Sequence, residues 1–453
     1  MSDTQSIISP STEQVIGAVP RRTLPEVDAI IERAARVVPA WRRVTPADRS
    51  RLLRRFADVV DAHVEELARL EVANAGHTIT NARWEAGNVR DVLAYYAGAP
   101  ERFAGKQIPV AGGVDVTFHE PLGVVGVIAP WNFPMPIASW GFAPALAAGN
   151  AVVLKPATLT PLTALRLGEL ALEAGLPEGV FQVVTGDGAL VGGRLVSHEA
   201  VRKICFTGST AVGRTVMAGC AEQMKRVTLE LGGKSANIVF ADADLERAAA
   251  QAPYAVFDNA GQDCCARSRI LVEQGAYERF MELFEAAVQG VRVLDPADEH
   301  SEMGPLISGA HRETVAAYVA SAEVAFVGSR PEGAGYWYAP TVLVGDRTGR
   351  AYREEIFGPV VSVVPFADEA EAVALANEGP FGLSGSLWTR DVGRALRVAR
   401  AVDTGTLSVN SNASVRYATP FGGFKQSGLG RELGPDALLE FSEEKNVFIA
   451  TEE

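Results

Sequence analysis

Short apolar runs alternate with amphipathic helical patterns along most of this chain, and this alternation constrains the fold more than any other feature. Near-continuous apolar strands separated by helices predict parallel sheet that is covered by helices on both faces. We therefore expect an α/β protein. In the first half, the predicted strands cover residues 124–130, 151–156, 180–184 and 203–209, and helices are predicted over 162–175 and 211–223.

The same rhythm continues in the second half of the chain. Residues 268–274, 360–366 and 385–389 are further apolar strands, and helical patterns follow Ala276 and Asp391. The 453 residues suffice for two to four domains. Strands are also predicted over 225–234 and 236–240, helices near 25–40 and over 46–75, a hairpin over 107–120 around Gly112 and Gly113, and a boundary between two α/β lobes around 230–240.

Charge and cysteine content exclude several classes of function. The formal net charge of −13 argues against nucleic acid or an anionic membrane as the main partner. The sequence starts without a basic segment followed by an apolar one, and no run of about 18 apolar residues follows, so neither a signal peptide nor a membrane span is expected. The four cysteines are too few for a disulfide scaffold and lack the spacing of a zinc site, which favours a cytoplasmic protein without a metal centre: Cys205, Cys220, Cys264 and Cys265.

The segment GQDCCARSR (261–269) places Cys264 and Cys265 in a polar, glycine-led loop before a predicted strand. A nucleophilic cysteine is a thiolate, and it requires an electropositive, partly accessible site. Many cysteines are instead small buried hydrophobic residues, but this loop favours a reactive role for one of the pair. Adjacent side chains usually point in different directions, so we do not expect the two cysteines to share a role.

Three other segments carry side chains suited to catalysis or phosphate binding. Glu230 ends the apolar strand in VTLELGGK, where a partly buried carboxylate can act as a general base, although a solvated strand-end glutamate is equally compatible. Asn132 lies between two prolines in PWNFP and could stabilise an oxyanion, but this segment alone favours an asparagine that satisfies a turn. FTGSTAVG (206–213) is a strand-to-helix turn that could bind phosphate, with Lys155 as a cation at the same sheet edge.

Together these segments resemble the aldehyde dehydrogenase superfamily over nearly the whole chain. Seven motifs occur in the family's order and approximate spacing: PWNFP, KPATLTP, FTGSTAVG, LELGGKS, GQDCCARSR, EEIFGPV and PFGGFKQSGLGRE. The resemblance implies NAD(P)-dependent, hydrolytic oxidation of an aldehyde to a carboxylate. It also implies three units, which are a Rossmann-like cofactor-binding domain (1–102 and 122–231), an α/β catalytic domain (232–430) and a small β oligomerisation element (103–121 and 431–453).

The resemblance further implies a role for each motif residue. Cys264 would be the nucleophile, Glu230 the general base, and Asn132 with the backbone N–H of Cys264 the oxyanion hole. The implied contacts to NAD or NADP are Trp131, Lys155, Thr158, Gly188, Gly208, Ser209, Leu231, Glu355 and Phe357. The implied substrate pocket is largely apolar and aromatic, which suits medium or aromatic aldehydes, and consists of Phe133, Ile137, Trp140, Asp263, Cys265, Val415 and Phe421.

Two departures from the family pattern affect these expectations. Many members carry a glutamate where this chain has Thr158, and that glutamate would repel the 2′-phosphate of NADP. With Thr158 and a nearby Lys155, we expect NADP to be accepted, with or without NAD. Many members also carry a lysine where this chain has Gly141, in a proton path with the glutamate that matches Glu432, so the route by which Glu230 loses its proton is open.

Substrate and assembly are less constrained by the sequence. Asp263 could favour an amino-aldehyde and Arg416 a semialdehyde carboxylate, unless both charges point outward from ordinary loops. Residues 103–121 and the tail 441–450 resemble oligomerisation elements, and because an isolated hairpin is marginal in water, we expect a homodimer or homotetramer. The alternative functions are a coenzyme A-acylating aldehyde dehydrogenase, which Glu230 disfavours, and a non-catalytic protein that retains the fold.

Overall fold

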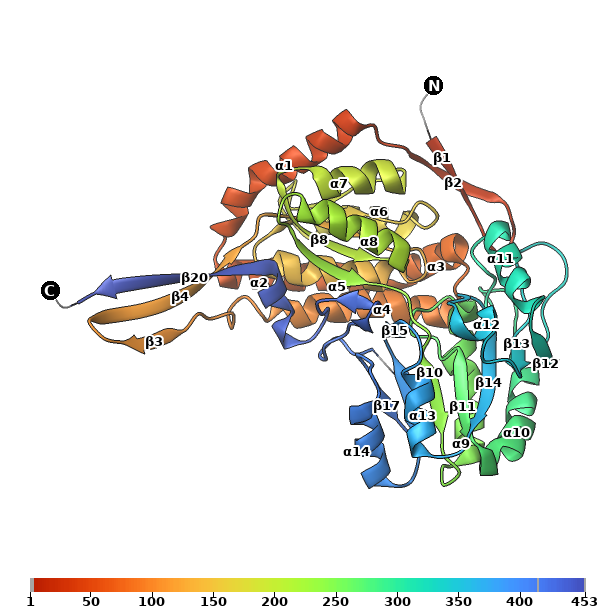
Figure 1. Cartoon of the computed structure of the whole chain (residues 1–453). Coiled ribbons are helices and arrows are strands. Elements are labelled where there is room, and N and C mark those ends of the chain that lie inside the picture. The colour runs from red at the N-terminus through yellow and green to blue at the C-terminus, as the bar shows by residue number, and fades with distance from the viewer. Residues whose placement is uncertain (1–3, 414, 452–453) are drawn as a thin grey trace.

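The structure is a computed structural model that describes residues 4–413 and 415–451. Two sheets of mainly parallel strands form the body, and a narrow three-stranded arm projects from it (Figure 1). The predicted α/β class is confirmed. The chain passes from the first sheet to the second between Glu230 and Ala236, within the predicted turn-rich stretch. Among the described residues, no helix combines the length and apolarity that crossing a bilayer requires.

The first sheet has the strand order β19-β9-β8-β5-β6-β7, and only the short edge strand β19 is antiparallel to its neighbour. Alternate residues of β5 face opposite layers, so Val124 packs with α1, α7 and α8, whereas Val125 packs with α5 and α6. All residues of α5 are buried. The strands are β5 (Val124–Ile128), β6 (Ala151–Lys155), β7 (Phe181–Val183), β8 (Val201–Thr207), β9 (Arg226–Glu230) and β19 (Gly428–Leu429), and the helices are α5 (Pro134–Ala147), α6 (Leu162–Glu173), α7 (Gly193–Ser197) and α8 (Thr210–Ala221).

The N-terminal segment differs from its prediction in three places. The single helix predicted over 46–75 is divided at His63, whose φ of −115° leaves the helical region and whose Nδ1 lies 2.8 Å from the carbonyl oxygen of Val59. A hairpin precedes the helices and was not predicted, and neither was α4. The elements are β1 (Thr4–Ile8), β2 (Val15–Pro20), α1 (Leu24–Arg42), α2 (Pro46–Ala62), α3 (Val64–Ala75) and α4 (Ile79–Ala97).

The second sheet has the order β12-β13-β14-β11-β10-β16-β17, with β12 as an antiparallel edge strand. The apolar runs predicted after residue 268 form β11, β14 and β16. Its strands are β10 (Ala236–Val239), β11 (Arg269–Glu273), β12 (Glu323–Val327), β13 (Thr341–Val344), β14 (Val360–Phe366), β16 (Gly385–Trp388) and β17 (Ser408–Val409). Its helices are α9 (Leu245–Phe257), α10 (Tyr277–Gln289), α11 (Gly309–Val319), α12 (Arg350–Arg353), α13 (Glu369–Ala376) and α14 (Val392–Ala401), and the short pair β15 (Phe381–Gly382) and β18 (Phe424–Lys425) lies beside it.

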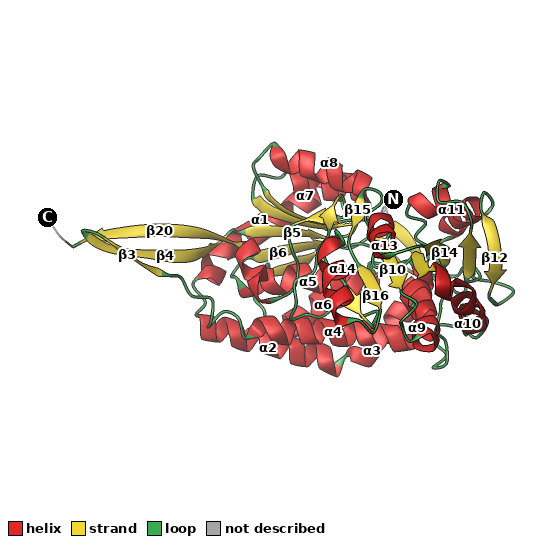
Figure 2. Cartoon of the chain, turned by 60° about the horizontal axis from the view of Figure 1, so that its bottom comes forward, coloured by secondary structure: helices red, strands yellow, loops and turns green. Residues whose placement is uncertain are grey.

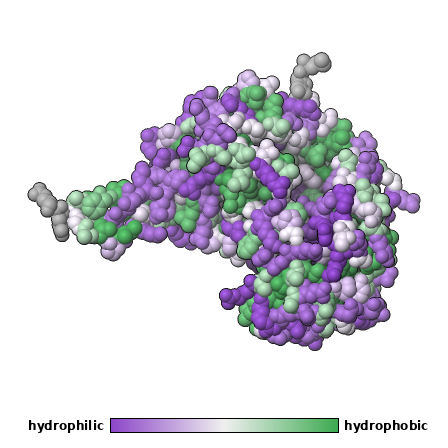
Figure 3. All heavy atoms as spheres, viewed as in Figure 1, coloured by the Kyte–Doolittle hydropathy of each residue, from purple (hydrophilic) through white to green (hydrophobic). Residues whose placement is uncertain are grey.

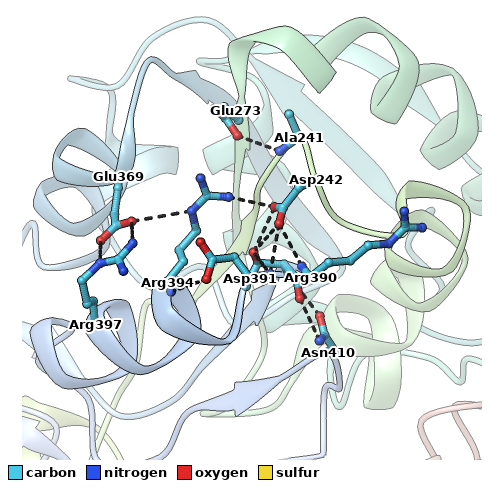
Figure 4. A network of polar contacts seen from close by, with 10 residues as sticks. Ala241, Asp242, Glu273, Glu369, Arg390, Asp391, Arg394, Arg397 and Asn410 are labelled. Carbon is cyan, nitrogen blue, oxygen red and sulfur yellow. Dashed lines mark hydrogen bonds and ion pairs between the residues drawn. The ribbon is translucent and has the colours of Figure 1, made fainter.

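A network of charged residues connects the segment after β10 to α13 and α14 (Figure 4). The Asp242 carboxylate accepts hydrogen bonds from the Arg390 backbone N–H at 3.0 Å and from Arg394 Nη1 at 2.8 Å. Glu369, at the start of α13, accepts 2.7 Å and 2.8 Å hydrogen bonds from Arg397 of α14. These contacts fix the start of α14 at the end of the second sheet that is farther from the first sheet.

The arm contains the predicted hairpin and a third strand from the C-terminal tail (Figure 2). The hairpin turns at Gly112, whose φ of 76° is in the left-handed region that favours glycine. The tail strand pairs with β4 over its whole length, from Ser442 opposite Pro121 to Ala450 opposite Gly113. The prediction of an isolated hairpin was therefore incomplete, since its partner strand belongs to the same chain. The strands are β3 (Gln107–Val110), β4 (Gly113–Pro121) and β20 (Ser442–Ala450).

Candidate active site

Two cavities meet at the Cys264 side chain. The larger, of about 850 Å³, lies at the carboxyl ends of β5, β6, β8 and β9, and the smaller, of about 240 Å³, lies between α4, α5 and the loop that follows α9. Among the described residues that line either cavity, Cys264 is the one that lines both. A thiol in this position can react with a molecule in the smaller cavity while a second molecule occupies the larger one.

All nine residues predicted to contact the cofactor line the larger cavity. The N-terminus of α8 opens onto it, with Ser209 as the N-cap that accepts a hydrogen bond from the Val212 backbone N–H. Unpaired N–H groups at a helix N-terminus bind phosphate, so the cavity fits a dinucleotide in both volume and donors. Burial lowers the pKa of Lys155 to about 8, although the nearby charge of Asp187 opposes this shift. Lys155 therefore stays substantially protonated at neutral pH, and an anion nearby would favour its charged form further.

Aromatic and acidic side chains form the end of the larger cavity nearest Cys264. The rings of Trp131 and Phe357 meet edge to face with centroids 5.3 Å apart. Glu355 Oε1 accepts a 2.8 Å hydrogen bond from the Gly233 backbone N–H, and burial raises the pKa of Glu355 to about 7. The carboxylate and the rings are thereby held in fixed positions beside the thiol.

The loop before Cys264 has a backbone that few sequences tolerate. Asn259, Ala260 and Gly261 have consecutive φ values of 50°, 54° and 68°, in the left-handed region that is costly for non-glycine residues. A Cβ at Gly261 would lie 2.1 Å from the Gly358 carbonyl oxygen, and a Cβ at Gly233 would lie 2.3 Å from that of Cys264. Close backbone packing from two directions therefore determines the position of Cys264.

The surroundings of the two cysteines differ from their prediction. Cys264 is half-buried, as expected, but the adjacent Cys265 thiol, burial and the negative charges of Asp263 and Glu230 raise its pKa well above the usual range. The expectation of an electropositive site is therefore wrong. Asp263, from the same loop, and Glu230, from β9, both contribute negative charge near Cys264. The two side chains also do not diverge, since both sulfur atoms and an Asp263 oxygen lie within 4.8 Å of one another.

Asn132 connects the loop after β5 to the cysteine loop. Its side-chain Nδ2 donates a 3.0 Å hydrogen bond to the Gln262 carbonyl oxygen, and its backbone carbonyl accepts a 2.7 Å hydrogen bond from Asn259 Nδ2. An amide nitrogen carries two protons, so one orients the Asn132 side chain and the second can be donated to an oxygen atom in the larger cavity that Asn132 lines.

Glu230 is buried at the end of β9 and lines neither cavity. Both of its carboxyl oxygens are buried without a hydrogen-bond partner among the described residues. Burial and the charge of Glu432 raise its pKa well above the usual range. The prediction of a raised pKa is thus supported by the geometry, and the side chain interacts electrostatically with Cys264.

Lys203 on β8 lies near Glu432. The sequence suggested that a cation was missing there, because Gly141 stands where many family members carry a lysine. A Cβ at Gly141 would lie 3.1 Å from Val127, so this position is closely packed. Lys203 is fully buried, donates a 2.7 Å hydrogen bond to Thr228 Oγ1 and lies 3.7 Å from the carboxylate of Glu440, which is 40% exposed. The charge of Lys203 lowers the pKa of Glu432, which burial raises to about 8. The cation beside Glu432 therefore comes from β8 and not from α5, which carries Gly141.

The comparisons with known proteins agree with this arrangement. A sequence profile described as “Aldehyde dehydrogenase family” matches residues 1–447. The chain belongs to the aldehyde dehydrogenase family. An aldehyde dehydrogenase of Emericella nidulans is 42% identical over 453 residues, which cover 98% of this chain and 91% of that protein. A phenylacetaldehyde dehydrogenase of Pseudomonas fluorescens is 41% identical over 465 residues, which cover 99% and 93%. The crystal structure of betaine aldehyde dehydrogenase from Staphylococcus aureus with NAD+ is similar with a TM-score of 0.97 at 36% identity, over 100% of this chain and 92% of that one.

The smaller cavity of this aldehyde dehydrogenase includes all seven predicted substrate-pocket residues. Trp140 and Phe421 form its floor, with ring centroids 5.2 Å apart. Arg416 is exposed and does not line the cavity, so it points outward, which is the alternative to a contact with a substrate carboxylate. The sequence reasoning missed several lining residues, for which no local motif gave a signal: Asn81 and Trp84 on α4, Tyr254 and Ala255 on α9, Asp258, Arg267 and Asn412.

Proposed function

We propose that this aldehyde dehydrogenase oxidises an aldehyde to a carboxylate with NAD+ or NADP+, with Cys264 as the covalent nucleophile. The observation that carries this proposal is the position of Cys264 in the walls of both cavities. NAD(P)+ held by the nine lining residues named above would supply the oxidising group that takes up hydride. The smaller cavity would hold the aldehyde beside the thiol.

The residues of the chain account for the remaining steps. Once the Cys264 thiol has released its proton to solvent, its thiolate adds to the aldehyde carbon, and the oxygen that becomes negative accepts hydrogen bonds from Asn132 Nδ2 and from the Cys264 backbone N–H. After oxidation, a thioester links the substrate to Cys264. Glu230, in its ionised form, deprotonates the water molecule that hydrolyses this thioester. Since both the nucleophile and the base are present, hydrolysis is favoured over acyl transfer to coenzyme A.

One assay separates the three candidate functions. Purified protein is mixed with an aldehyde and NAD+ or NADP+, with and without coenzyme A, and the absorbance of the reduced nicotinamide is followed. The proposal predicts reduction without coenzyme A and a carboxylate product. Reduction that requires coenzyme A would indicate the acylating enzyme, and no reduction with a broad set of aldehydes would indicate a non-catalytic protein.

We also propose the predicted domain boundaries, a cytoplasmic location and a homodimer or homotetramer. Strands β5 to β9 share one sheet, and β10 to β14 with β16 and β17 form the other, although β19, from the proposed catalytic domain, pairs with β9. The four cysteines are free, which suits a reducing compartment.

The arm supports assembly through its edges. Phe118, Phe448 and Ile449 are 49%, 51% and 53% exposed, and apolar surface gathers toward the tip of the arm (Figure 3). Its outer strands β3 and β20 each leave one edge unpaired among the described residues, which favours pairing with another chain. Sedimentation as a monomer at micromolar concentration would contradict an oligomer.

A further inference from the structure

Two carboxylates line the smaller cavity. Asp263 immediately precedes the nucleophile, and Asp258 directly follows α9. Asp258 Oδ1 accepts hydrogen bonds from Asn81 Nδ2 and from the Asn259 backbone N–H, and Asp263 Oδ1 accepts one of 2.8 Å from the Cys265 backbone N–H. Neither forms an ion pair within 4.0 Å among the described residues. Burial and the charge of Asp263 raise the pKa of Asp258 to about 6, as expected for negative charges that are incompletely compensated.

The one buried cation in the cavity wall is already engaged by the protein. Arg267 donates through Nε to Ser386 Oγ at 3.0 Å, through Nη1 to the Cys265 carbonyl at 2.5 Å, and through Nη2 to the Asn412 carbonyl at 3.2 Å. These bonds hold the guanidinium against the floor of the cavity. Arg267 reduces the negative charge of the wall, but two carboxylates against one guanidinium leave an excess of negative charge.

The layer behind Asp258 supplies no further compensating charge. His77, Glu71 and Glu85 form a buried cluster there, with ligand atoms within 4.8 Å of one another. Burial lowers the pKa of His77 and raises that of Glu71 to about 8 and that of Glu85 well above its usual range. At neutral pH these groups are therefore mostly uncharged, and the field in the cavity comes from Asp258, Asp263 and Arg267.

Aromatic rings form most of the remaining wall. Phe133, Trp140 and Phe421 lie near the nucleophile, and Trp84 and Tyr254, which are 51% and 65% exposed, lie at the mouth. The negative faces of aromatic rings attract cations, and this attraction strengthens where water is excluded. A cation would therefore be attracted by both the carboxylates and the aromatic rings of the wall, whereas a substrate carboxylate would be repelled by both.

We propose that the preferred substrates are compact aldehydes that carry a positively charged amine a few bonds from the carbonyl group. This inference rests on the proposed aldehyde oxidation through Cys264. The cavity of about 240 Å³ sets the size limit, and because Asp258 and Cys264 line the same cavity, one compact molecule can present its amine to Asp258 and its carbonyl carbon to the thiol. Asp263 contributes charge close to the reacting atoms.

Two matched pairs of aldehydes test the inference at about pH 8, where amines are protonated and carboxylates ionised. The first pair is 3-aminopropanal and butanal, which have the same number of non-hydrogen atoms. The second is succinic semialdehyde and 4-methylpentanal, in which a carboxylate replaces an isopropyl group of similar shape. We expect kcat/KM to be about tenfold higher for 3-aminopropanal than for butanal, and about tenfold lower for succinic semialdehyde than for 4-methylpentanal.

A variant assigns the preference to the cavity wall. In Asp258→Asn, the ratio of kcat/KM between 3-aminopropanal and butanal should fall toward one. Glu246→Gln removes an exposed carboxylate from α9, the helix that precedes Asp258, and should leave the ratio unchanged. If Asp258→Asn does not fold, the kcat/KM ratios of the wild-type protein for the two aldehyde pairs still test the inference.

The outcomes distinguish this inference from the proposed function. Butanal oxidised as well as or better than 3-aminopropanal, or an unaltered ratio in folded Asp258→Asn, would overturn the amine preference and leave aldehyde oxidation intact. If none of the four aldehydes reduces NAD+ or NADP+, the proposed function itself fails.

Discussion

Glu230 and Glu432 are buried as neighbours, so that burial and the charge of Glu432 together raise the pKa of Glu230 well above its usual range. Burial also raises the pKa of Glu432 to about 8. Two carboxyl groups in this situation share protons, and their titration belongs to the pair. The base that hydrolyses the thioester therefore ionises at higher pH than an ordinary glutamate.

The first prediction concerns the pH dependence of turnover. A general base is active when ionised, and the raised pKa of Glu230 means that it ionises at higher pH than an ordinary glutamate, so kcat should rise with pH above the usual carboxyl range. In Glu432→Gln the neighbouring negative charge is removed, the pKa of Glu230 falls, and the acid limb of the kcat profile should move to lower pH by about one unit. A profile that stays in place or moves to higher pH would contradict the coupling of the two residues.

Lys203 should act on Glu230 through Glu432. Its charge lowers the pKa of Glu432, so Lys203→Met should favour protonated Glu432, which lowers the pKa of Glu230 and moves the acid limb to lower pH, by about half a unit. Lys225→Met is the matched control, because Lys225 is also a buried lysine but donates to the His198 carbonyl oxygen at 2.6 Å, away from the carboxyl pair. A merely structural role for Lys203 would lower kcat at every pH without moving the limb.

Replacement of Glu230 should separate oxidation from hydrolysis. Glu230→Gln keeps the shape of the side chain but cannot accept the proton of water, so kcat should fall by about 10² to 10⁴. The first turnover does not need this base. Stopped-flow absorbance should therefore show a burst of about one reduced nicotinamide per active site, followed by slow turnover. Loss of the burst together with turnover would place Glu230 in the oxidation step instead.

The sheets could be predicted from the sequence because their strands are continuous apolar runs, and the site motifs because they lie at strand ends and in glycine-rich turns. Helix α4 was missed because buried polar residues, Glu85 and Asn88, interrupt its apolar pattern. That omission also removed Asn81 and Trp84 from the predicted pocket. Their place beside the nucleophile depends on how α4 packs against α5, which no local pattern encodes.

The charge around Cys264 could not be predicted for the same reason. The loop sequence contains one acid beside the cysteine, whereas Glu230 reaches the thiol from a different strand and Arg267 is held by carbonyl groups far along the chain. Similarly, the absence of a side chain at Gly141 did not indicate that Lys203 would lie near Glu432. In each case the residues are separated in sequence and brought together only by packing.

Cofactor preference is expected to depend on Thr158. It lines the larger cavity and its Oγ1 donates to the Gly186 carbonyl oxygen at 3.4 Å, so position 158 lies within reach of a bound dinucleotide. In Thr158→Glu a carboxylate would repel the 2′-phosphate of NADP+, and kcat/KM with NADP+ should fall about tenfold or more while that with NAD+ changes less. Thr158→Gln introduces a side chain of the same size without charge and should affect the two cofactors alike. A strong NAD+ preference in the wild-type protein would refute the expected acceptance of NADP+.

The most direct test compares the two adjacent cysteines in the same assay. Cys264→Ser and Cys265→Ser each replace one sulfur atom with oxygen, and reduction of NAD(P)+ is followed with a saturating aldehyde. Among the described residues, Cys264 alone lines both cavities, so Cys264→Ser should lose turnover by about 10³ or more, whereas Cys265→Ser should remain within about tenfold of the unchanged protein. Turnover that survives in Cys264→Ser, or that disappears in Cys265→Ser alone, would contradict the assignment of the nucleophile.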